Sequence, residues 1–340
     1  MALVLVTGGS GFIGRHLVGA LLSQGDEVRV LDVADAQRPG IDFVRGSVDD
    51  LGAVEQALDG VDCLYHLAGV AHLWQRDKGK YDRVNRRGTE TVIGAAAERS
   101  IARVVHCSTE SILLPKRRSG DAYVDESAEP RLEDMPGLYT RSKLLAERVA
   151  LKAARGGLDV VVVNPTVPIG DGDSNRTPPA AMFSLFLSGG APFFLDCVLN
   201  LVDVRDVADG IVRAGRHGRV GERYILGGEN VRLSELLPIL ELKSGRRMPR
   251  RVLPAWVALA TGIAAGWIAD RVTHRPPAAT REGVELALRS APFDCSKARN
   301  ELGYAPRSID GALTEVVEGF KRERGGGDER GFRQHFDKQA

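Results

Sequence analysis

A tyrosine and a lysine stand four residues apart in the stretch Tyr139–Lys143. The preceding Pro136 and Gly137 predict the start of a helix, and residues four apart project from the same helix face. A tyrosine phenol has an ordinary pKa of about 10 and is a poor base at neutral pH. A neighbouring ammonium stabilises the phenolate and lowers that pKa. The pair therefore predicts proton exchange with a substrate alcohol or carbonyl, with Tyr139 as the general acid or base.

Two hydroxyl-bearing residues, Ser108 and Thr109, follow an apolar run that ends at Cys107. In an open α/β sheet, ligands bind at the carboxyl ends of the strands. A hydroxyl placed there can hydrogen-bond the reacting oxygen and stabilise its developing charge. We assign this role to Thr109 first and to Ser108 second. The alternative is a polar strand end that only satisfies local backbone groups.

Glycines follow the first apolar run of the chain and lead into its first amphipathic stretch. Glycines so placed let the chain turn sharply and let backbone N–H groups approach a pyrophosphate. The helix that follows offers unpaired N–H groups and a partial positive charge to the phosphates. Because a strand precedes the motif and a helix follows it, the motif predicts a dinucleotide site. Its residues are Gly8, Gly11, Phe12, Ile13 and Gly14.

An aspartate, Asp32, ends the second apolar run, 18 residues after Gly14. A carboxylate at this place accepts hydrogen bonds from the adenosine ribose and repels a 2′-phosphate. We therefore predict NAD as the cofactor in preference to NADP. Arg38 lies nearby and would favour NADP if its loop folded back towards the ribose.

Short apolar runs alternate with longer amphipathic stretches through the first half of the chain. Strands rich in Val, Ile and Leu, separated by helices, predict an α/β fold with a doubly wound parallel sheet of the Rossmann type. The predicted strands are Leu3–Val6, Glu27–Leu31, Asp42–Val44, Cys63–Leu67, Val104–Cys107 and Val160–Val163, and the predicted helices Phe12–Leu22, Leu51–Leu58, Tyr81–Arg99 and Leu138–Ala154.

The second half is less regular, with prolines and glycines that mark loops after Asn164. Short strands at Leu201–Val202 and Tyr224–Leu226 and helices at Val204–Ala214 and Ser234–Lys243 follow. We expect a dinucleotide-binding domain over 1–164, a smaller substrate-binding lobe over 165–322, interleaved with the end of the sheet, and a disordered charged tail over 323–340.

The run Val252–Ala269 contains no charged residue and has a tryptophan near each end. A spanning helix needs about 20 apolar residues, and Pro254, Gly262 and Gly266 weaken this run further. The favoured interpretation is a buried or pocket-lining helix. Contact with a membrane surface, or an apolar tunnel for the substrate, is the alternative.

The overall composition is that expected of a soluble globular protein. A formal net charge of +1 supplies no broad field for a nucleic-acid partner. The four cysteines are far apart in the sequence and form no C-x-x-C pair, which disfavours a metal site or disulfide framework. The N-terminus lacks the features of a signal peptide, so we expect a cytoplasmic protein, with membrane association as the alternative.

Together these motifs resemble the extended short-chain dehydrogenase/reductase family, and the resemblance runs from Met1 to about residue 320. Within it, the second half is most similar to the branch of dihydroflavonol reductases, 3β-hydroxysteroid dehydrogenases and hopanoid-associated sugar epimerases. The carrying stretches are 66–69, 84–89, 163–170, 200–208 and 221–230, beside the glycine motif, the hydroxyl cluster and the tyrosine–lysine pair.

The resemblance implies further cofactor contacts. The stretch Leu67, Ala68 and Gly69 would line the cofactor, Asn85 would lie near the site, and Pro165 would contact the nicotinamide end. Lys143 would also hold the nicotinamide ribose, beside Tyr139. The family also implies a homodimer formed through the two long helices.

Two departures from the family pattern bear on the reaction. Sugar-nucleotide dehydratases continue their Ser-Thr pair with Asp-Glu, whereas Glu110-Ser111 follows here, so the acid and base for water elimination are not both present. Many sugar-nucleotide enzymes carry an arginine where Leu199-Asn200 stands, which disfavours a nucleotide-sugar substrate.

Three functions remain open from the sequence. The first is an NAD(P)-dependent carbonyl reductase or alcohol dehydrogenase for a fairly apolar small molecule, such as a steroid-, flavonol- or polyketide-like compound. The second is a sugar epimerase with tightly bound NAD. The third is a dinucleotide-binding protein that has lost catalysis, against which the intact pair of Tyr139 and Lys143 argues.

Overall fold

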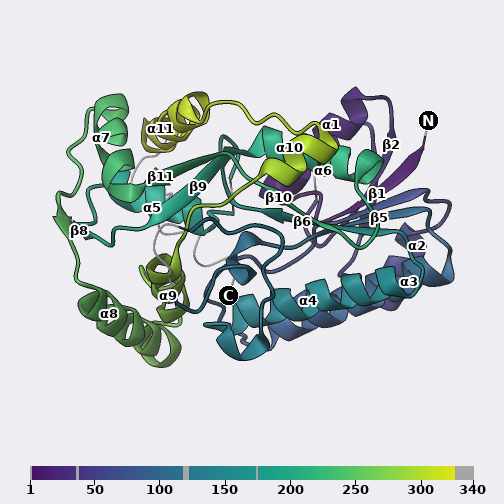
Figure 1. The fold of residues 1–340 in the computed structure, drawn as a ribbon, viewed down its shortest axis with the longest axis horizontal. Coiled ribbons are helices and arrows are strands. Elements are labelled where there is room, and N and C mark those ends of the chain that lie inside the picture. Colours follow the sequence, from purple (N-terminus) through teal and green to yellow (C-terminus); the bar gives the residue numbers. More distant parts are fainter. Residues whose placement is uncertain (1, 36–37, 118–121, 174, 326–340) are drawn as a thin grey trace.

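A seven-stranded sheet forms the centre of this computed structural model, which describes residues 2–35, 38–117, 122–173 and 175–325. Its neighbouring strands all pair in parallel, in the order β10-β6-β5-β4-β1-β2-β3 (Figure 1). From β1 the chain adds β2 and β3 on one side, and it then returns to add β4, β5 and β6 on the other side. Sheets of this kind bind ligands at the switch point between β1 and β4. The predicted doubly wound sheet is therefore confirmed. Its strands are β1 (Leu3–Thr7), β2 (Glu27–Asp32), β3 (Ile41–Arg45), β4 (Cys63–His66), β5 (Arg103–Cys107), β6 (Val160–Pro165) and β10 (Arg223–Leu226).

Helices cover both faces of this sheet, and each layer packs on its own hydrophobic core (Figure 1). Because both faces are covered, every strand needs apolar side chains in both directions, and β6 accordingly is buried along its whole length. One layer contains α1 (Phe12–Ser23), α6 (Val204–His217) and α10 (Ser296–Leu302), and the other α2 (Leu51–Ala57), α3 (Gly88–Glu98) and α4 (Leu138–Arg155).

The predicted helix Tyr81–Arg99 has two parts. Its first part, η1 (Tyr81–Arg87), is a π-helix, and α3 follows directly from Gly88. Short π-helical segments within helices occur frequently at functional sites. This one carries Asn85, which the family resemblance places near the site.

A second, smaller unit is built around a three-stranded sheet of order β11-β9-β7 and a two-stranded sheet of β8 and β12. The strands β7, β8, β11 and β12 have at most four residues each, and the sequence pattern did not predict them. This unit contains β7 (Val167–Ile169), β8 (Phe193–Phe194), β9 (Val198–Asp203), β11 (Glu229–Arg232) and β12 (Arg251–Val252), with α5 (Pro178–Leu187), α7 (Leu233–Ser244), α8 (Ala255–Ile268), α9 (Arg281–Arg289) and α11 (Asp310–Gly325).

The two units exchange segments. Strand β10, from the second half of the chain, pairs with β6 at the edge of the large sheet, and α6 packs against α1. Helix α11 continues to Gly325, three residues into the segment 323–340 for which we expected disorder. The rest of that segment lies outside the described residues.

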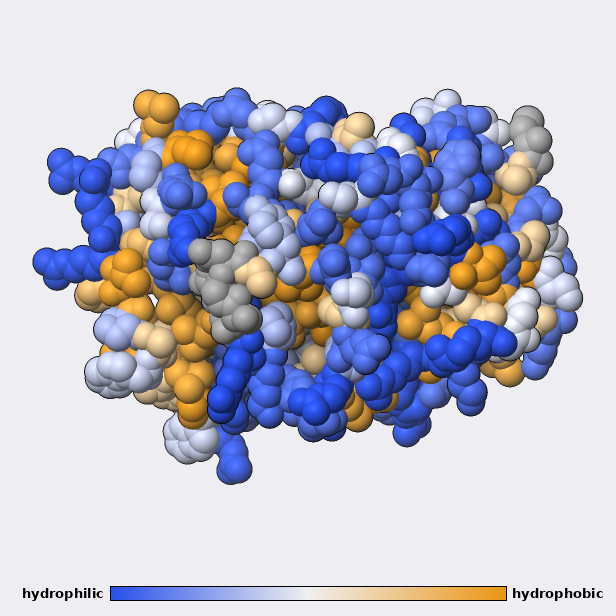
Figure 2. All heavy atoms as spheres, in the orientation of Figure 1, coloured by the Kyte–Doolittle hydropathy of each residue, from blue (hydrophilic) through white to orange (hydrophobic). Residues whose placement is uncertain are grey.

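Helix α8 is not buried, which corrects the favoured interpretation of Val252–Ala269. Only Ala258 and Gly262 of its residues are buried, whereas Trp256 and Trp267 are 76% and 61% exposed. In Figure 2 orange and pale atoms gather over α8 at the lower left, whereas blue atoms predominate over the centre. No helix within the described ranges is long and apolar enough to cross a bilayer.

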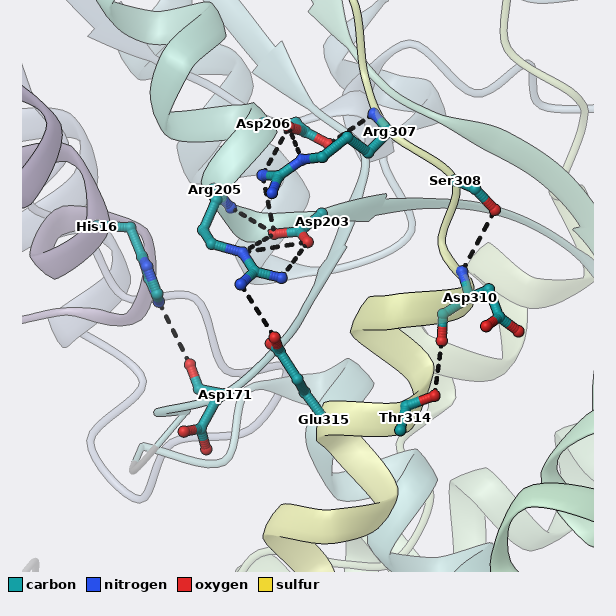
Figure 3. Close-up of polar contacts among 10 residues, drawn as sticks. All are labelled: His16, Asp171, Asp203, Arg205, Asp206, Arg307, Ser308, Asp310, Thr314 and Glu315. Atoms are coloured by element: carbon teal, nitrogen blue, oxygen red, sulfur yellow. Dashed lines mark hydrogen bonds and ion pairs between the residues drawn. The ribbon is translucent and has the colours of Figure 1, made fainter.

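A polar network joins the C-terminal end of β9 to the last helix (Figure 3). Asp203 caps α6 by accepting a hydrogen bond from the Arg205 backbone N–H at 2.8 Å. The Arg205 guanidinium bridges Asp203, at 2.6 Å, and Glu315 of α11, at 2.9 Å. Arg307 pairs with Asp206 at 2.8 Å. These ion pairs hold the smaller unit against the helix layer of the large sheet.

Candidate active site

The glycine motif forms a tight turn at the switch point of the sheet. Gly8 has a φ of 75°, and a Cβ atom there would come within 2.7 Å of the Ala68 backbone nitrogen. A Cβ atom on Gly14 would overlap the carbonyl oxygen of Gly8. Only glycine therefore fits these two positions, because the turn must approach both the next strand end and its own helix.

Helix α1 begins directly after this turn, with Gly11 in the position before its first residue. Phe12 is buried and its ring meets the His16 ring edge-on at 5.8 Å, while Ile13 packs against the core. Both side chains thus point into the protein. These residues can therefore offer a phosphate the backbone N–H groups of the first helical turn.

Asp32 lies at the end of β2, beside the glycine turn. Its carboxylate accepts hydrogen bonds from the Ser10 backbone N–H at 3.0 Å and from the Ala34 N–H at 3.1 Å. These bonds fix the carboxylate next to the turn, as a ribose-binding acid requires. Arg38 instead lies along α1, where it donates to the carbonyl oxygen of Arg15 at 2.9 Å.

The segment after β4 is held to the glycine turn and to η1. Ala68 N–H donates to the Thr7 hydroxyl at 3.2 Å. Asn85 is buried: its amide oxygen accepts from the Val70 N–H at 2.7 Å, and its NH₂ group donates to the Ser142 hydroxyl at 2.9 Å. Asn85 therefore connects the predicted cofactor-lining stretch Leu67–Gly69 to α4.

Tyr139 and Thr109 meet at the end of β5. Both are buried, and the Thr109 side chain is near enough to the Tyr139 phenol to lower its pKa, against the larger effect of burial. The Thr109 hydroxyl also donates to the Glu110 carboxylate at 2.9 Å. Ser108 is buried as well, and its hydroxyl has no hydrogen-bond partner within the described part of the chain.

Lys143 lies one turn after Tyr139 on the buried face of α4. Its ammonium donates to the Cys107 carbonyl oxygen at 2.7 Å, at the end of β5. This bond uses one of three N–H donors and leaves the others for a ligand. Burial lowers the pKa of Lys143.

The phenol of Tyr139 differs electrostatically from the sequence-based expectation. Burial, and after it the neighbouring Glu110 carboxylate, raise the pKa of Tyr139 above its ordinary value. The Lys143 ammonium is bonded to the Cys107 carbonyl oxygen at 2.7 Å. With the chain's own groups alone, Tyr139 is therefore a protonated acid.

Two carboxyl groups complete this region, and neither was assigned a role from the sequence. Glu110 is partly buried, and burial raises its pKa to about 7. Glu282 of α9 accepts hydrogen bonds from the backbone N–H groups of Tyr139, at 3.3 Å, and Thr140, at 2.8 Å. It therefore caps the first turn of the helix that carries Tyr139.

Glu282 could not be found from sequence because 143 residues separate it from Tyr139. Glu110 stood in the sequence only as a departure from the dehydratase pattern, and its raised pKa depends on packing. Asn164, quoted there as part of a motif, is fully buried and donates to the Thr109 carbonyl oxygen at 3.1 Å and to Glu147 at 2.9 Å. It fixes the strand end next to Pro165.

His66 is a core residue at the end of β4. Its two ring nitrogens hydrogen-bond the hydroxyls of Thr7 at 2.7 Å and Thr89 at 3.0 Å. Burial lowers the pKa of His66 to about 3. The ring is therefore neutral and structural.

A model of the NAD dependent epimerase/dehydratase family matches residues 4–227. The chain belongs to this family. A protein of Synechocystis sp. named as a dihydroflavonol 4-reductase is 37% identical over 330 residues, covering 93% of this chain and 94% of the relative. Sterol demethylase protein B of Methylococcus capsulatus is 30% identical, covering 94% and 98%. The chain thus lies in the predicted extended short-chain dehydrogenase/reductase branch.

Solved structures of family members agree with this fold. The structure of gox2253 has a TM-score of 0.83 and 31% identity, covering 95% of this chain and 99% of that one. The dTDP-glucose 4,6-dehydratase DesIV of Streptomyces venezuelae, solved with NAD bound, has a TM-score of 0.75 and 27% identity, covering 96% and 99%. Membership makes this chain an NAD-dependent oxidoreductase or epimerase.

The residues present fit a dinucleotide. The glycine turn leaves no room for side chains above Gly8 and Gly14, the Asp32 carboxylate is fixed beside it, and the Ser108 hydroxyl is buried without a partner among the described residues. A buried hydroxyl without a partner is costly unless a ligand or water satisfies it. The predicted cofactor and catalytic residues lie at the carboxyl ends of β1, β2, β4, β5 and β6 and on the helices α1, η1 and α4.

Proposed function

We propose that this chain is an NAD-dependent carbonyl reductase or alcohol dehydrogenase for a fairly apolar substrate. The observation that carries the proposal is the meeting of the buried Tyr139 and Thr109 side chains at the end of β5, with Lys143 one helical turn further along α4. The steroid- and flavonol-related names of the relatives agree with a substrate of that polarity.

The proposed mechanism uses three side chains. Thr109 hydrogen-bonds the substrate oxygen and stabilises its developing charge. Tyr139, protonated because burial raises its pKa, gives its proton to that oxygen in the reductive direction. Lys143 holds the nicotinamide ribose and, once turned from Cys107, brings a positive charge towards the phenol. The nicotinamide, when bound, supplies or accepts the hydride at the substrate carbon.

We favour NAD over NADP. The Asp32 carboxylate would lie beside the ribose hydroxyls and repel a 2′-phosphate. Arg38, the alternative sequence candidate for a 2′-phosphate partner, bonds the Arg15 carbonyl instead. We also propose a cytoplasmic homodimer that pairs through α3 and α4, to be tested by light scattering of the purified chain.

Sugar-nucleotide chemistry is disfavoured by Asn200. This residue lies in the middle of β9, at the place where many sugar-nucleotide enzymes hold a diphosphate with arginine. Its side chain is buried and bonded to Thr166, at 2.9 Å, and to Asn230, at 2.8 Å. It is therefore occupied in structural contacts and carries no positive charge for a diphosphate.

The proposal is tested by incubating the purified chain with NADH and a set of apolar ketones, including steroid and flavanone carbonyls. Consumption of NADH with formation of the alcohol is expected. A chain that retains NAD through purification and inverts a sugar stereocentre, without net consumption of cofactor, would instead be an epimerase.

A further inference from the structure

Helix α8 presents an apolar stripe to solvent along its length. The stripe repeats at intervals of three and four residues, so its members share one helix face. Its large side chains are 76% (Trp256), 49% (Ile263), 61% (Trp267) and 44% (Ile268) exposed. We call these the α8 stripe, together with the exposed alanines between them: Trp256, Ala260, Ile263, Ala264, Trp267 and Ile268.

The rest of α8 explains why this face is turned outward. The opposite face, with Ala258 and Gly262, packs on α9, where a Cβ atom on Gly262 would already be 3.1 Å from Val284. Exposed Val252 and Val272 extend the apolar surface beyond both helix ends. The helix contains no charged residue whose long side chain could cover the α8 stripe, so the stripe is in contact with water. A contiguous apolar patch of this kind marks a contact surface.

Positive charge is concentrated at both ends of α8. The segment 246–275 carries six arginines and one acidic residue, Asp270, although the whole chain has a formal charge of only +1. Asp270 is itself paired with Lys78 at 2.8 Å. Arg251 at one end and Arg271 at the other are both exposed. An apolar stripe between two basic ends is complementary to an apolar layer bordered by anions.

A second copy of the chain does not supply that complement. In a two-fold contact the same patch meets itself. The arginines before α8 would then lie against the arginines of the other copy, and like charges at close range repel. A bilayer offers acyl chains to the stripe and phosphates to the arginines at the same time.

We propose that α8 is an in-plane anchor that docks the protein on a bilayer containing anionic lipids. The α8 stripe enters the boundary between headgroups and acyl chains, with Trp256 and Trp267 at that boundary. The arginines at its ends bind the lipid phosphates. A helix of this length, about 21 Å, is too short to span the hydrocarbon core of about 30 Å.

The anchor lies next to the candidate active site. Helix α9 separates the two: its Gly283 lies against Leu73, where a Cβ atom would be 3.1 Å from the Leu73 side chain. Leu73 in turn packs with Val70 and Tyr139. A docked protein would therefore place Tyr139 near the surface from which an apolar substrate leaves the bilayer. This substrate route rests on the proposed function, whereas docking itself does not.

The test is co-sedimentation of the full chain with phosphatidylcholine vesicles, with and without phosphatidylglycerol. We expect binding that requires phosphatidylglycerol and weakens at high salt, because surface charges are screened. Trp256→Ser with Trp267→Ser should weaken the partitioning of the protein to the vesicles by about a hundredfold, since each substitution removes the burial of one large apolar side chain. Arg251→Gln with Arg271→Gln should weaken binding to the vesicles that contain phosphatidylglycerol.

The matched control is Leu242→Ser on α7, which removes another side chain that is 86% exposed but lies outside the α8 stripe. It should leave vesicle binding unchanged. Brominated lipids should quench the tryptophan fluorescence of the natural chain and not that of the double tryptophan variant. Turnover of a water-dissolved ketone should be equal in all of these variants, so a failed reductase assay leaves the docking result intact.

The proposal is overturned if the chain stays in the supernatant with anionic vesicles, or if Leu242→Ser reduces binding as much as the tryptophan changes. It is also overturned if the tryptophan variants dissociate a dimer in the absence of lipid. In that case a second copy covers α8.

Discussion

The residue scale centres on the protonation of Tyr139. Its phenol is buried, and burial together with Glu110 raises its pKa, so it carries its proton at neutral pH. Carbonyl reduction needs that proton, whereas alcohol oxidation needs the phenolate. The chain's own groups therefore favour carbonyl reduction. For alcohol oxidation, a cation beside the phenol must first lower the pKa of Tyr139.

Removing the phenol hydroxyl tests this assignment. Tyr139→Phe should lower kcat/KM for ketone reduction by about 10²–10⁴-fold, the usual contribution of a positioned acid. The affinity for NADH, measured by fluorescence titration, should change little. A variant that keeps its full turnover and cellular role would point to the non-catalytic alternative.

Glu110 should control the pH dependence of the oxidative reaction. Its pKa of about 7 means that it is ionised above neutral pH, and its charge then raises the pKa of Tyr139. Glu110→Gln removes that charge, so the rise of the oxidation rate with pH should move to lower pH. Rates measured across the pH range check this, with Glu90→Gln, at an exposed position of α3, as a control that should leave the profile unchanged.

The same carboxyl should leave a signature in stability. The pKa of Glu110 is raised from 4.5 to about 7 in the folded protein. Its contribution to the stability of the fold is therefore fully present at pH values below 4.5 and is lost as the pH rises through 7. Glu110→Gln should therefore unfold at a higher temperature than the natural chain at alkaline pH. A difference that persists unchanged at mildly acidic pH would contradict this.

On the scale of elements, the first turn of α4 depends on a helix from the other unit. Glu282 of α9 accepts from two backbone N–H groups and from the Thr140 hydroxyl at 2.7 Å. A Cβ atom on Gly137 would overlap the Glu282 carboxylate, so the glycine before α4 makes room for this cap. The angle at which α4 presents Tyr139 is thus set partly by α9.

Loss of this cap should lower turnover because it displaces Tyr139. Glu282→Ala should lower the free energy of unfolding by about 1–2 kcal/mol, as other lost helix caps do. It should also lower kcat more than it raises KM, because Tyr139 loses its alignment. Glu285→Ala, on the same helix but paired with Arg281 and Arg289, provides the control. Equal effects of both changes on kcat would show that Glu282 is merely structural.

Sequence reasoning located the elements whose signals are local. The strands of the large sheet are continuous apolar runs bounded by turns, and the glycine turn and α4 carry their residues within a few positions. Strands β8 and β12 have two residues each, too few for periodicity to reveal. The apolar composition of α8 predicted a helix. Whether that helix is buried or exposed depends on the elements that pack against it, and α9 covers only one of its faces.

On the scale of the whole molecule, binding of the dinucleotide should stabilise both units together, since Gly14 and Asp32 belong to one and the loops after β6 to the other. At a hundredfold excess over its Kd, NADH should add about 2.7 kcal/mol to the free energy of unfolding. Thermal unfolding of the natural chain with NADH and with NADPH measures this and the cofactor preference together. Gly14→Ala should abolish the ligand-dependent shift, since its added Cβ overlaps Gly8.

The exchange of β10 and α6 between the two units restricts how new specificities can be built into this chain. A chimera made with one crossover after residue 164 would keep β6 without its neighbour β10 and α1 without its partner α6. Such a graft would remove Val207, Ile211 and Val212 of α6 from the core that they form with Leu17 and Val18 of α1. Substrate lobes from relatives should therefore be transplanted with two crossovers, so that Val204–Leu226 stays with the recipient.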